Sequence, residues 1–334
     1  MNEILSTQNL LNKSGSLANP GYAKRMLYVY DRSRVKCPPF KLKEWDFYQI
    51  HFGHIVLQMT MGHVSYASSV SATLIDLDTG KRRSVGKQIM FHNVFKNKMP
   101  TDPEKPNSIK YFSDDLLCQF EVTDKGRRLS LTSVGKKGLK AEIDVLLTNC
   151  SSDKDKMVIA TPFKKPRQWY LNYKENCFAV NGRCRIDDMA YEIHNGFGLL
   201  DWGRGVWPYS HSWVWGNGGT VVDGKHFGFN IGWGFGNTSA ATENMFFYDN
   251  KAYKLGKVDE MQIGNDYRYE DEEGRFVFDV EMLYDNFTQA KAVIVNNSCH
   301  QRFGLWCGYV VLDDGQRLYV PPFLAFCEHA KNNW

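Results

Sequence analysis

The pattern that most constrains the fold is a succession of short segments in which apolar and polar residues alternate, separated by turn residues. Alternation with a period of two is typical of β-strands, because successive side chains point to opposite faces. The pattern begins near Trp45 and is clear in segment 47–52. Residues 64–77 predict one long strand, which returns through the turn 78–81 as segment 82–91.

The remaining chain repeats this pattern, and no segment of the first 150 residues shows a sustained helical period with capping residues. The dipeptide Asn181-Gly182 predicts a tight hairpin turn. Many short strands with regular turn signals indicate a barrel or a sandwich. We therefore expect an all-β protein with antiparallel sheets.

A short polar run at residues 151–156, SSDKDK, is the best candidate for a domain boundary. It predicts an N-terminal β domain, residues 1–155, that begins with a loop-like arm, and a C-terminal β domain, residues 156–334. Two β halves of similar size suggest two barrel-like domains packed together. An antiparallel barrel of about eight strands can enclose one small ligand.

Composition excludes several classes of protein. The 334 residues carry a net charge of +4, and the basic residues are scattered, so we expect no nucleic-acid partner. The N-terminus has no signal-peptide pattern, and no apolar run is as long as a membrane span. The eight cysteines form no C-x-x-C pair, which predicts reduced thiols rather than a zinc knuckle. We expect a cytoplasmic protein without a membrane span; the oligomeric state stays open.

Residues 192–219 are unusually rich in glycine and tryptophan, and together with Trp233 they hold five of the nine tryptophans. Large flat apolar side chains, adaptable backbone and few charges are the composition of a small-molecule pocket at the junction of the two halves. The alternative is a structural cluster of turns, in which Asp201 bonds to Arg204 or to backbone amides.

Asp201 is the first candidate for a catalytic group. Its neighbours Leu199, Leu200 and Trp202 predict partial burial, which raises the pKa of a carboxyl and makes it a general acid. Glu243, just before a predicted strand, is the second candidate. The candidate ligand-binding residues are Trp202, Arg204, Trp207, Tyr209, His211, Trp213, Trp215, Asn244 and His194.

Common cofactor motifs are missing from the sequence. It contains no H-E-x-x-H, no G-x-S-x-G and no glycine-rich phosphate loop. His51 and His54 are three residues apart, so on one strand they would point to opposite faces. We therefore predict no metal and no organic cofactor.

Four blocks of sequence together resemble a family: LDWGRGVWPY at residues 200–209, W-V-W at 213–215, T-E-N at 242–244, and the ending C-E-H…W at 327–334. They are similar to the bacterial proteins grouped as domain of unknown function 2804. The resemblance covers nearly the whole chain from Trp45 onward. It implies no activity, because none is assigned to that family.

The same segment bears a more distant resemblance to two-domain lipocalin-like proteins, which include carotenoid hydratases and tocopherol cyclases. That resemblance implies two lipocalin-like barrels. It also implies that Asp201 is an acid that protonates an alkene. The tryptophans at 202, 207, 213 and 215 would then face the resulting cation, which aromatic faces stabilise.

The leading hypothesis is therefore binding of an apolar or amphipathic small molecule at the junction, with acid-initiated hydration or cyclisation if the protein is an enzyme. The first alternative is carbohydrate binding or cleavage, in which tryptophans stack on sugar rings and Asp201 and Glu243 are paired carboxylates. The second alternative is a non-catalytic carrier or structural protein.

Overall fold

The computed structural model describes residues 1–64, 67–136, 138–149, 153–292 and 295–333. Within these ranges almost all regular structure is β-strand, and the helices are two short 3-10 turns, η1 (Arg32–Arg34) and η2 (Pro39–Lys41). The all-β prediction is confirmed. No helix of the described part has the length and apolar character needed to cross a membrane.

The first large sheet contains twelve strands within the described ranges. Ten of them follow the order β7-β6-β5-β4-β14-β13-β11-β10-β9-β8, and β12 joins β2 to β13. The strands are β2 (Gly21–Ala23), β4 (Leu42–Phe52), β5 (Ile55–Val64), β6 (Ala67–Asp76), β7 (Arg82–Met90), β8 (Asn107–Phe112), β9 (Leu116–Thr123), β10 (Gly126–Val134), β11 (Lys140–Thr148), β12 (Met157–Pro162), β13 (Trp169–Ile186) and β14 (Met189–Val206).

The second large sheet contains nine strands of the described chain, in the order β18-β17-β16-β15-β23-β22-β21-β20-β19. They are β15 (Ser210–Val222), β16 (Lys225–Trp233), β17 (Met245–Tyr248), β18 (Lys251–Lys254), β19 (Val258–Ile263), β20 (Asp266–Asp271), β21 (Phe276–Ala292), β22 (Val295–Val311) and β23 (Arg317–Asn333). In the N-terminal arm, β1 (Gln8–Asn9) and β3 (Tyr28–Val29) form a small parallel pair.

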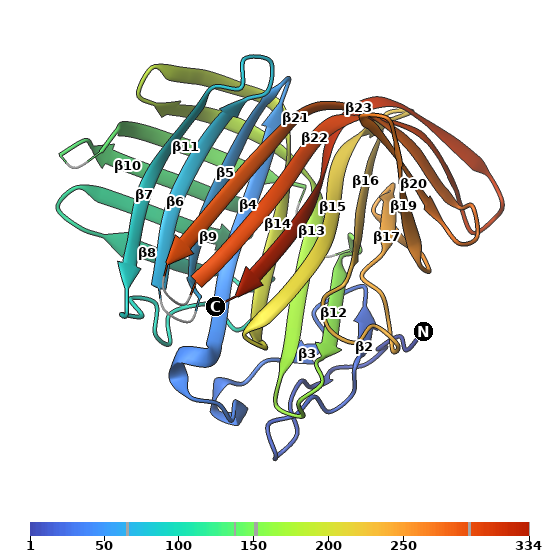
Figure 1. Ribbon diagram of the computed structural model, residues 1–334, viewed down its shortest axis with the longest axis horizontal. Helices are drawn as coiled ribbons and strands as arrows, with labels where there is room; N and C mark the ends of the chain where they lie inside the picture. Colours follow the sequence, from blue (N-terminus) through green and yellow to red (C-terminus); the bar gives the residue numbers. More distant parts are fainter. Residues whose placement is uncertain (65–66, 137, 150–152, 293–294, 334) are drawn as a thin grey trace.

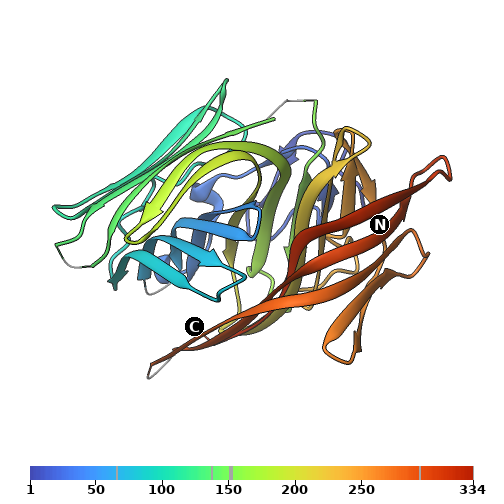
Figure 2. The same cartoon turned by 90° about the horizontal axis from the view of Figure 1, so that it is seen from above.

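Both large sheets are strongly curved half-barrels that pack against each other (Figure 1, Figure 2). Each sheet has its own apolar core, which contains Trp169 and Trp202 in the first and Phe229 and Trp306 in the second. A third cluster combines side chains from both sheets, among them Leu199, Trp215 and Phe326. This third cluster joins the halves into one body, beside the candidate site.

Two details of the sequence interpretation are wrong. Residues 64–77 are not one strand: Val64 ends β5, Ala67 begins β6, and the two residues pair across an antiparallel ladder, while 65–66 lie outside the described residues. Asn181-Gly182 is not a hairpin turn but an irregularity within β13, where the register shifts and Gly182 has a φ of 144°. A β-bulge uses the positive φ of glycine as a turn does, so the same dipeptide fits either structure and the prediction of a turn was wrong.

The predicted boundary after residue 155 does not coincide with the change of sheet. Strands β12, β13 and β14 follow that position in sequence but pair within the first sheet. The chain enters the second sheet at Ser210, the first residue of β15. The long strands β13 and β14 thus belong to the first sheet, and both contact β15 of the second sheet.

Candidate functional site

A cavity of about 250 Å³ lies between the two sheets, near the turn that joins β14 to β15. Engineered cavities of about 150 Å³ hold a benzene molecule, so this volume suits a small organic ligand. The lining is mostly aromatic, with a few charged groups. It consists of Trp45, Phe47, Thr60, Val64, Tyr170, Lys174, Asp201, Trp207, Trp213, Trp215, Phe235, Glu243 and Glu328.

Strand β14 presents Asp201, Gly203 and Gly205 on one face, because alternate residues of a strand share a side. A Cβ atom at Gly203 would lie 1.9 Å from the Trp45 ring, and one at Gly205 would lie 2.4 Å from Trp207 Nε1. Only glycine therefore leaves room for these two indole rings over the strand. The glycines of the motif provide space for aromatic side chains within a strand, rather than a flexible bend.

Asp201 sits in the middle of this aromatic face. Its backbone pairs with Phe47 of β4 on one side and with Lys174 of β13 on the other. Asn172 donates a hydrogen bond to its Oδ1 at 2.5 Å, and the Trp45 indole N–H donates to its Oδ2 at 3.2 Å. The residue is only 9% exposed, so the carboxyl lies at the edge of the cavity with little contact to solvent.

Glu328 of β23 reaches the cavity from the second sheet. The Trp213 indole donates to its Oε1 at 2.8 Å, and the Gln301 side chain donates to its Oε2 at 3.3 Å. Its backbone pairs with Trp215 of β15. The indole of Trp213 therefore fixes the orientation of a second buried carboxyl.

Lys174 and Glu243 form an ion pair within the cavity, with Lys174 Nζ 2.9 Å from Glu243 Oε2. Lys174 Nζ also lies 3.9 Å from the centre of the Trp215 ring. Asn230 links Trp215 and Glu243, since its amide accepts from the Trp215 indole at 2.7 Å and donates to Glu243 Oε2 at 3.2 Å. The face of the Trp215 ring thus lies against the ammonium group of Lys174.

Burial has the largest effect on the pKa of two of the carboxyls that line the cavity. It raises the pKa of Asp201, although Lys174 and the hydrogen bonds from Asn172 and Trp45 act in the opposite direction. It raises the pKa of Glu328 to about 7, against the lowering effects of Trp213 and Lys174 and with a further increase from the charge of Asp201. The cavity can therefore hold a transferable proton near neutral pH.

Five of the residues predicted from the sequence line the cavity: Asp201, Trp207, Trp213, Trp215 and Glu243.

The other predicted residues lie outside the lining. Trp202 is fully buried in the first core, and the Asn244 amide is engaged by backbone groups of Gly232 and Gly256. His211 stacks behind Trp213, with ring centres 5.8 Å apart. Tyr209 is 53% exposed, and His194 is exposed on β14.

Arg204 does not pair with Asp201. The structure therefore does not contain the Asp201–Arg204 bond that was expected for a structural cluster of turns. Its guanidinium is fully buried on the other face of β14, where it donates to Asp46 at 2.9 Å and to the Trp45 carbonyl at 2.6 Å. Residues 201 and 204 differ by three positions, which places them on opposite faces of a strand.

Eight of the thirteen residues that line the cavity were not predicted from the sequence. Trp45, Phe47, Tyr170 and Lys174 come from β4 and β13, and their position depends on strand register. Glu328 belongs to the C-E-H…W block, but the sequence alone assigned it no role in the site. Its place in that block, together with an apolar strand around it, was the available signal.

In comparisons with known proteins, the family model described as "Domain of unknown function (DUF2804)" matches residues 1–334. A search of curated proteins finds no match. Among solved structures, kievitone hydratase from Nectria haematococca is similar with a TM-score of 0.53 and 9% identity, over 98% of each chain. A protein from Nitrosomonas europaea, provisionally assigned as ATTH, is similar with a TM-score of 0.50 and 13% identity, over 90% of this chain and 95% of its own. At such identities the likeness shows a shared fold.

Proposed function

The chain belongs to the DUF2804 family, as the four sequence blocks predicted. We propose that its cavity binds an apolar or amphipathic small molecule and hydrates or cyclises it by acid catalysis. The observation that carries this proposal is a buried carboxyl of raised pKa, Asp201, set in an aromatic wall. The hydratase named among the solved structures supports the reaction class through its fold.

In the proposed reaction, the Asp201 carboxyl transfers its proton to one carbon of an alkene. The π electrons form the new C–H bond, and positive charge develops on the neighbouring carbon. In hydration, a water oxygen bonds to that carbon, and the proton which this water loses returns to a carboxylate, Asp201 or Glu328. In cyclisation, a nucleophile of the same molecule takes the place of water. Both reactions balance without an oxidant or a reductant.

The aromatic lining would stabilise the cation in this reaction. Trp45 and Tyr170 stack with ring centres 5.8 Å apart, and Trp207 meets the Trp45 ring edge-on at 5.0 Å. Aromatic faces attract cations most strongly where water is excluded. The contact between Lys174 and Trp215 illustrates this attraction within the same cavity.

Glycoside cleavage fits the cavity less well. That function would need Asp201 and Glu243 as paired carboxylates. Glu243 is instead held by Lys174 and by Asn230, and the rest of the lining offers few polar groups for sugar hydroxyls. A carrier function would use the same cavity without proton transfer.

Proton transfer is tested with a panel of apolar and phenolic alkenes incubated with the protein in D₂O, and separately in H₂¹⁸O. Hydration should place deuterium on carbon and ¹⁸O in the new hydroxyl. Asp201→Asn should lower the rate by about 10²–10⁴-fold, the usual contribution of a general acid, and still bind the compound. The matched control is Asp279→Asn, which alters an exposed aspartate of β21 and should react as the wild type does. Binding without any turnover by the wild type would favour the carrier.

A further inference from the structure

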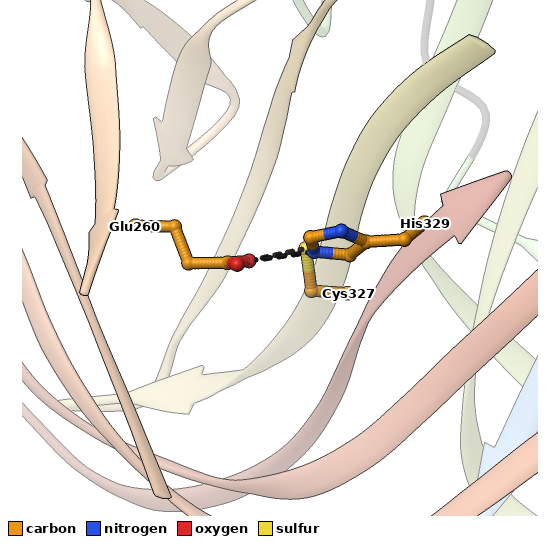
Figure 3. A group of neighbouring side chains, drawn as sticks. All are labelled: Glu260, Cys327 and His329. Atoms are coloured by element: carbon orange, nitrogen blue, oxygen red, sulfur yellow. Dashed lines mark hydrogen bonds and ion pairs between the residues drawn. The ribbon is translucent and has the colours of Figure 1, made fainter. Parts of the chain in front are cut away.

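On the concave side of the second sheet, away from the cavity, three different donor side chains converge. Figure 3 shows Glu260 of β19 pointing toward Cys327 and His329 of β23. The carboxylate oxygen, the thiol sulfur and the imidazole nitrogen all lie within 4.8 Å of one another. The two β23 residues share a face because they are two positions apart.

Curvature of the sheet brings these strands together. Strand β19 is an edge strand, and three strands separate it from β23 in the order of the sheet. Glu260 nevertheless lies with its Oε2 2.8 Å from His329 Nε2 and 4.0 Å from Cys327 Sγ. The three side chains thus connect β19 with β23 across the interior of the half-barrel.

The cluster is separate from the proposed catalytic site. Glu328 lies between Cys327 and His329 in sequence but points to the opposite face, where it lines the cavity. Cys327 belongs instead to the apolar core of the second sheet.

We propose that Glu260, Cys327 and His329 bind a divalent transition metal ion of the zinc class. Thiolate, imidazole and carboxylate are the ligand types that zinc uses in proteins. Zinc–ligand bonds of about 2.0–2.3 Å in a tetrahedron separate the donor atoms by roughly 3.3–3.7 Å. The separations of 2.8 Å and 4.0 Å lie on either side of that range, so small side-chain movements suffice.

The surroundings suit such an ion. The Tyr269 hydroxyl donates to Glu260 Oε2 at 2.8 Å, and hydrogen bonds of this kind orient metal-ligating carboxylates. The side chains of His329 and Glu260 are 31% and 17% exposed, which leaves a route for the ion and room for water as a fourth ligand. The bound ion would hold β19 against β23.

The simpler interpretation is an ion pair between Glu260 and His329, to which Cys327 contributes nothing. The two interpretations differ in the role of sulfur. Titration of the purified, reduced protein with Zn²⁺ alone, followed by calorimetry, should give one equivalent per chain. His329→Gln and Cys327→Ser should each weaken binding by at least about tenfold.

Two variants serve as matched controls. Cys307→Ser removes an exposed thiol of β22, and His300→Gln alters a half-buried histidine that pairs with Asp285 at 2.7 Å. Both should bind Zn²⁺ as tightly as the wild type. The proposal would be overturned if the wild type did not bind Zn²⁺ stoichiometrically. It would also be overturned if neither His329→Gln nor Cys327→Ser weakened the binding.

Cobalt gives a second readout that does not depend on affinity. Co²⁺ bound through a thiolate absorbs in the near ultraviolet by charge transfer, and this band should vanish in Cys327→Ser and persist in Cys307→Ser. If Cys327→Ser does not fold, as judged by its circular dichroism, the same comparison uses His329→Gln, which should shift the visible ligand-field band of Co²⁺. Co²⁺ spectra without a thiolate band in the wild type would also overturn the proposal.

Discussion

At the scale of single residues, Glu328 shows how burial controls the chemistry of the cavity. The side chain accepts hydrogen bonds from Trp213 and Gln301, both of which favour the ionised form. Burial outweighs them and raises the pKa to about 7. A hydrogen-bonded carboxyl with a pKa near neutrality can donate or accept a proton at the cavity.

This pKa has a consequence for stability. A carboxyl whose pKa is raised in the folded state stabilises that state below its ordinary value of 4.5, and this contribution is lost as the pH rises through about 7. The free energy of unfolding of the wild type should therefore fall between pH 4.5 and pH 7 by roughly 3 kcal/mol through this group. Urea denaturation at pH 5 and pH 8 measures the fall, which should be smaller in Glu328→Gln.

The control for that experiment is Glu142→Gln, which alters an exposed glutamate paired with Arg183 at 2.6 Å. It should leave the difference between the two pH values as in the wild type. An unchanged fall in Glu328→Gln would mean that this carboxyl is ionised throughout.

Trp213 and Trp215 should respond differently to truncation, although both face the cavity. Trp215 is 5% exposed and packs on Phe47 and Phe326, so Trp215→Ala should destabilise the protein by about 3–5 kcal/mol. Trp213 is half-buried, so Trp213→Ala should cost less stability and mainly weaken ligand binding. Melting curves beside a binding titration separate the two effects. Equal losses of stability without any change in binding would favour a purely structural cluster.

At the scale of elements, β14 is the strand that assembles the site. Its glycines admit the indole rings of Trp45 and Trp207, and the first of these rings donates to Asp201. The strand lies between β4 and β13, so its register decides which side chains surround the acid. A glycine at position 203 is therefore a requirement of the site as well as of the fold.

Gly203→Ala tests this requirement. The added methyl would overlap the Trp45 ring, so the indole must move and the hydrogen bond to Asp201 must lengthen. We expect a loss of about 1–3 kcal/mol in the free energy of unfolding and a reduced rate in the deuterium assay. Gly219→Ala is the control, because its Cβ would meet its nearest atom at 3.4 Å, an ordinary contact. A Gly203→Ala protein with the stability and rate of the wild type would contradict the account.

How far the sequence could predict these elements depends on the range of the interactions. Alternation is local, so segment 47–52 falls within β4 and the hairpin formed by β6 and β7 has its turn in the predicted place. The reversal between β5 and β6 was missed because small and β-branched residues continue through it. Asn181-Gly182 was misassigned because a bulge and a turn require the same glycine.

For the site, sequence proximity explains both the success and the failure. Asp201, Trp207 and the two cavity tryptophans of β15 are close in sequence, so composition alone revealed them. Trp45 lies 156 residues before Asp201, and Lys174 faces it only through the β13–β14 register. Such pairings depend on which strands meet, and no local pattern of this chain specifies that.

At the scale of the whole molecule, the cavity exists only because two half-barrels meet. Asp201 and Trp45 come from the first sheet, and Trp213 and Glu328 come from the second. The apolar cluster of Leu199, Trp215 and Phe326 holds the sheets together beside it. A ligand in this cavity would contact both halves at once, so binding and packing of the halves are coupled.

The most direct test of the central claim is a crystal structure of the Asp201→Asn protein with a bound alkene from the panel, since this variant should hold the compound without converting it. The account predicts that the compound occupies the cavity between Trp45 and Trp213, with an alkene carbon in contact with the side chain at position 201. A compound bound elsewhere on the protein, or one whose alkene lies away from residue 201, would contradict the account.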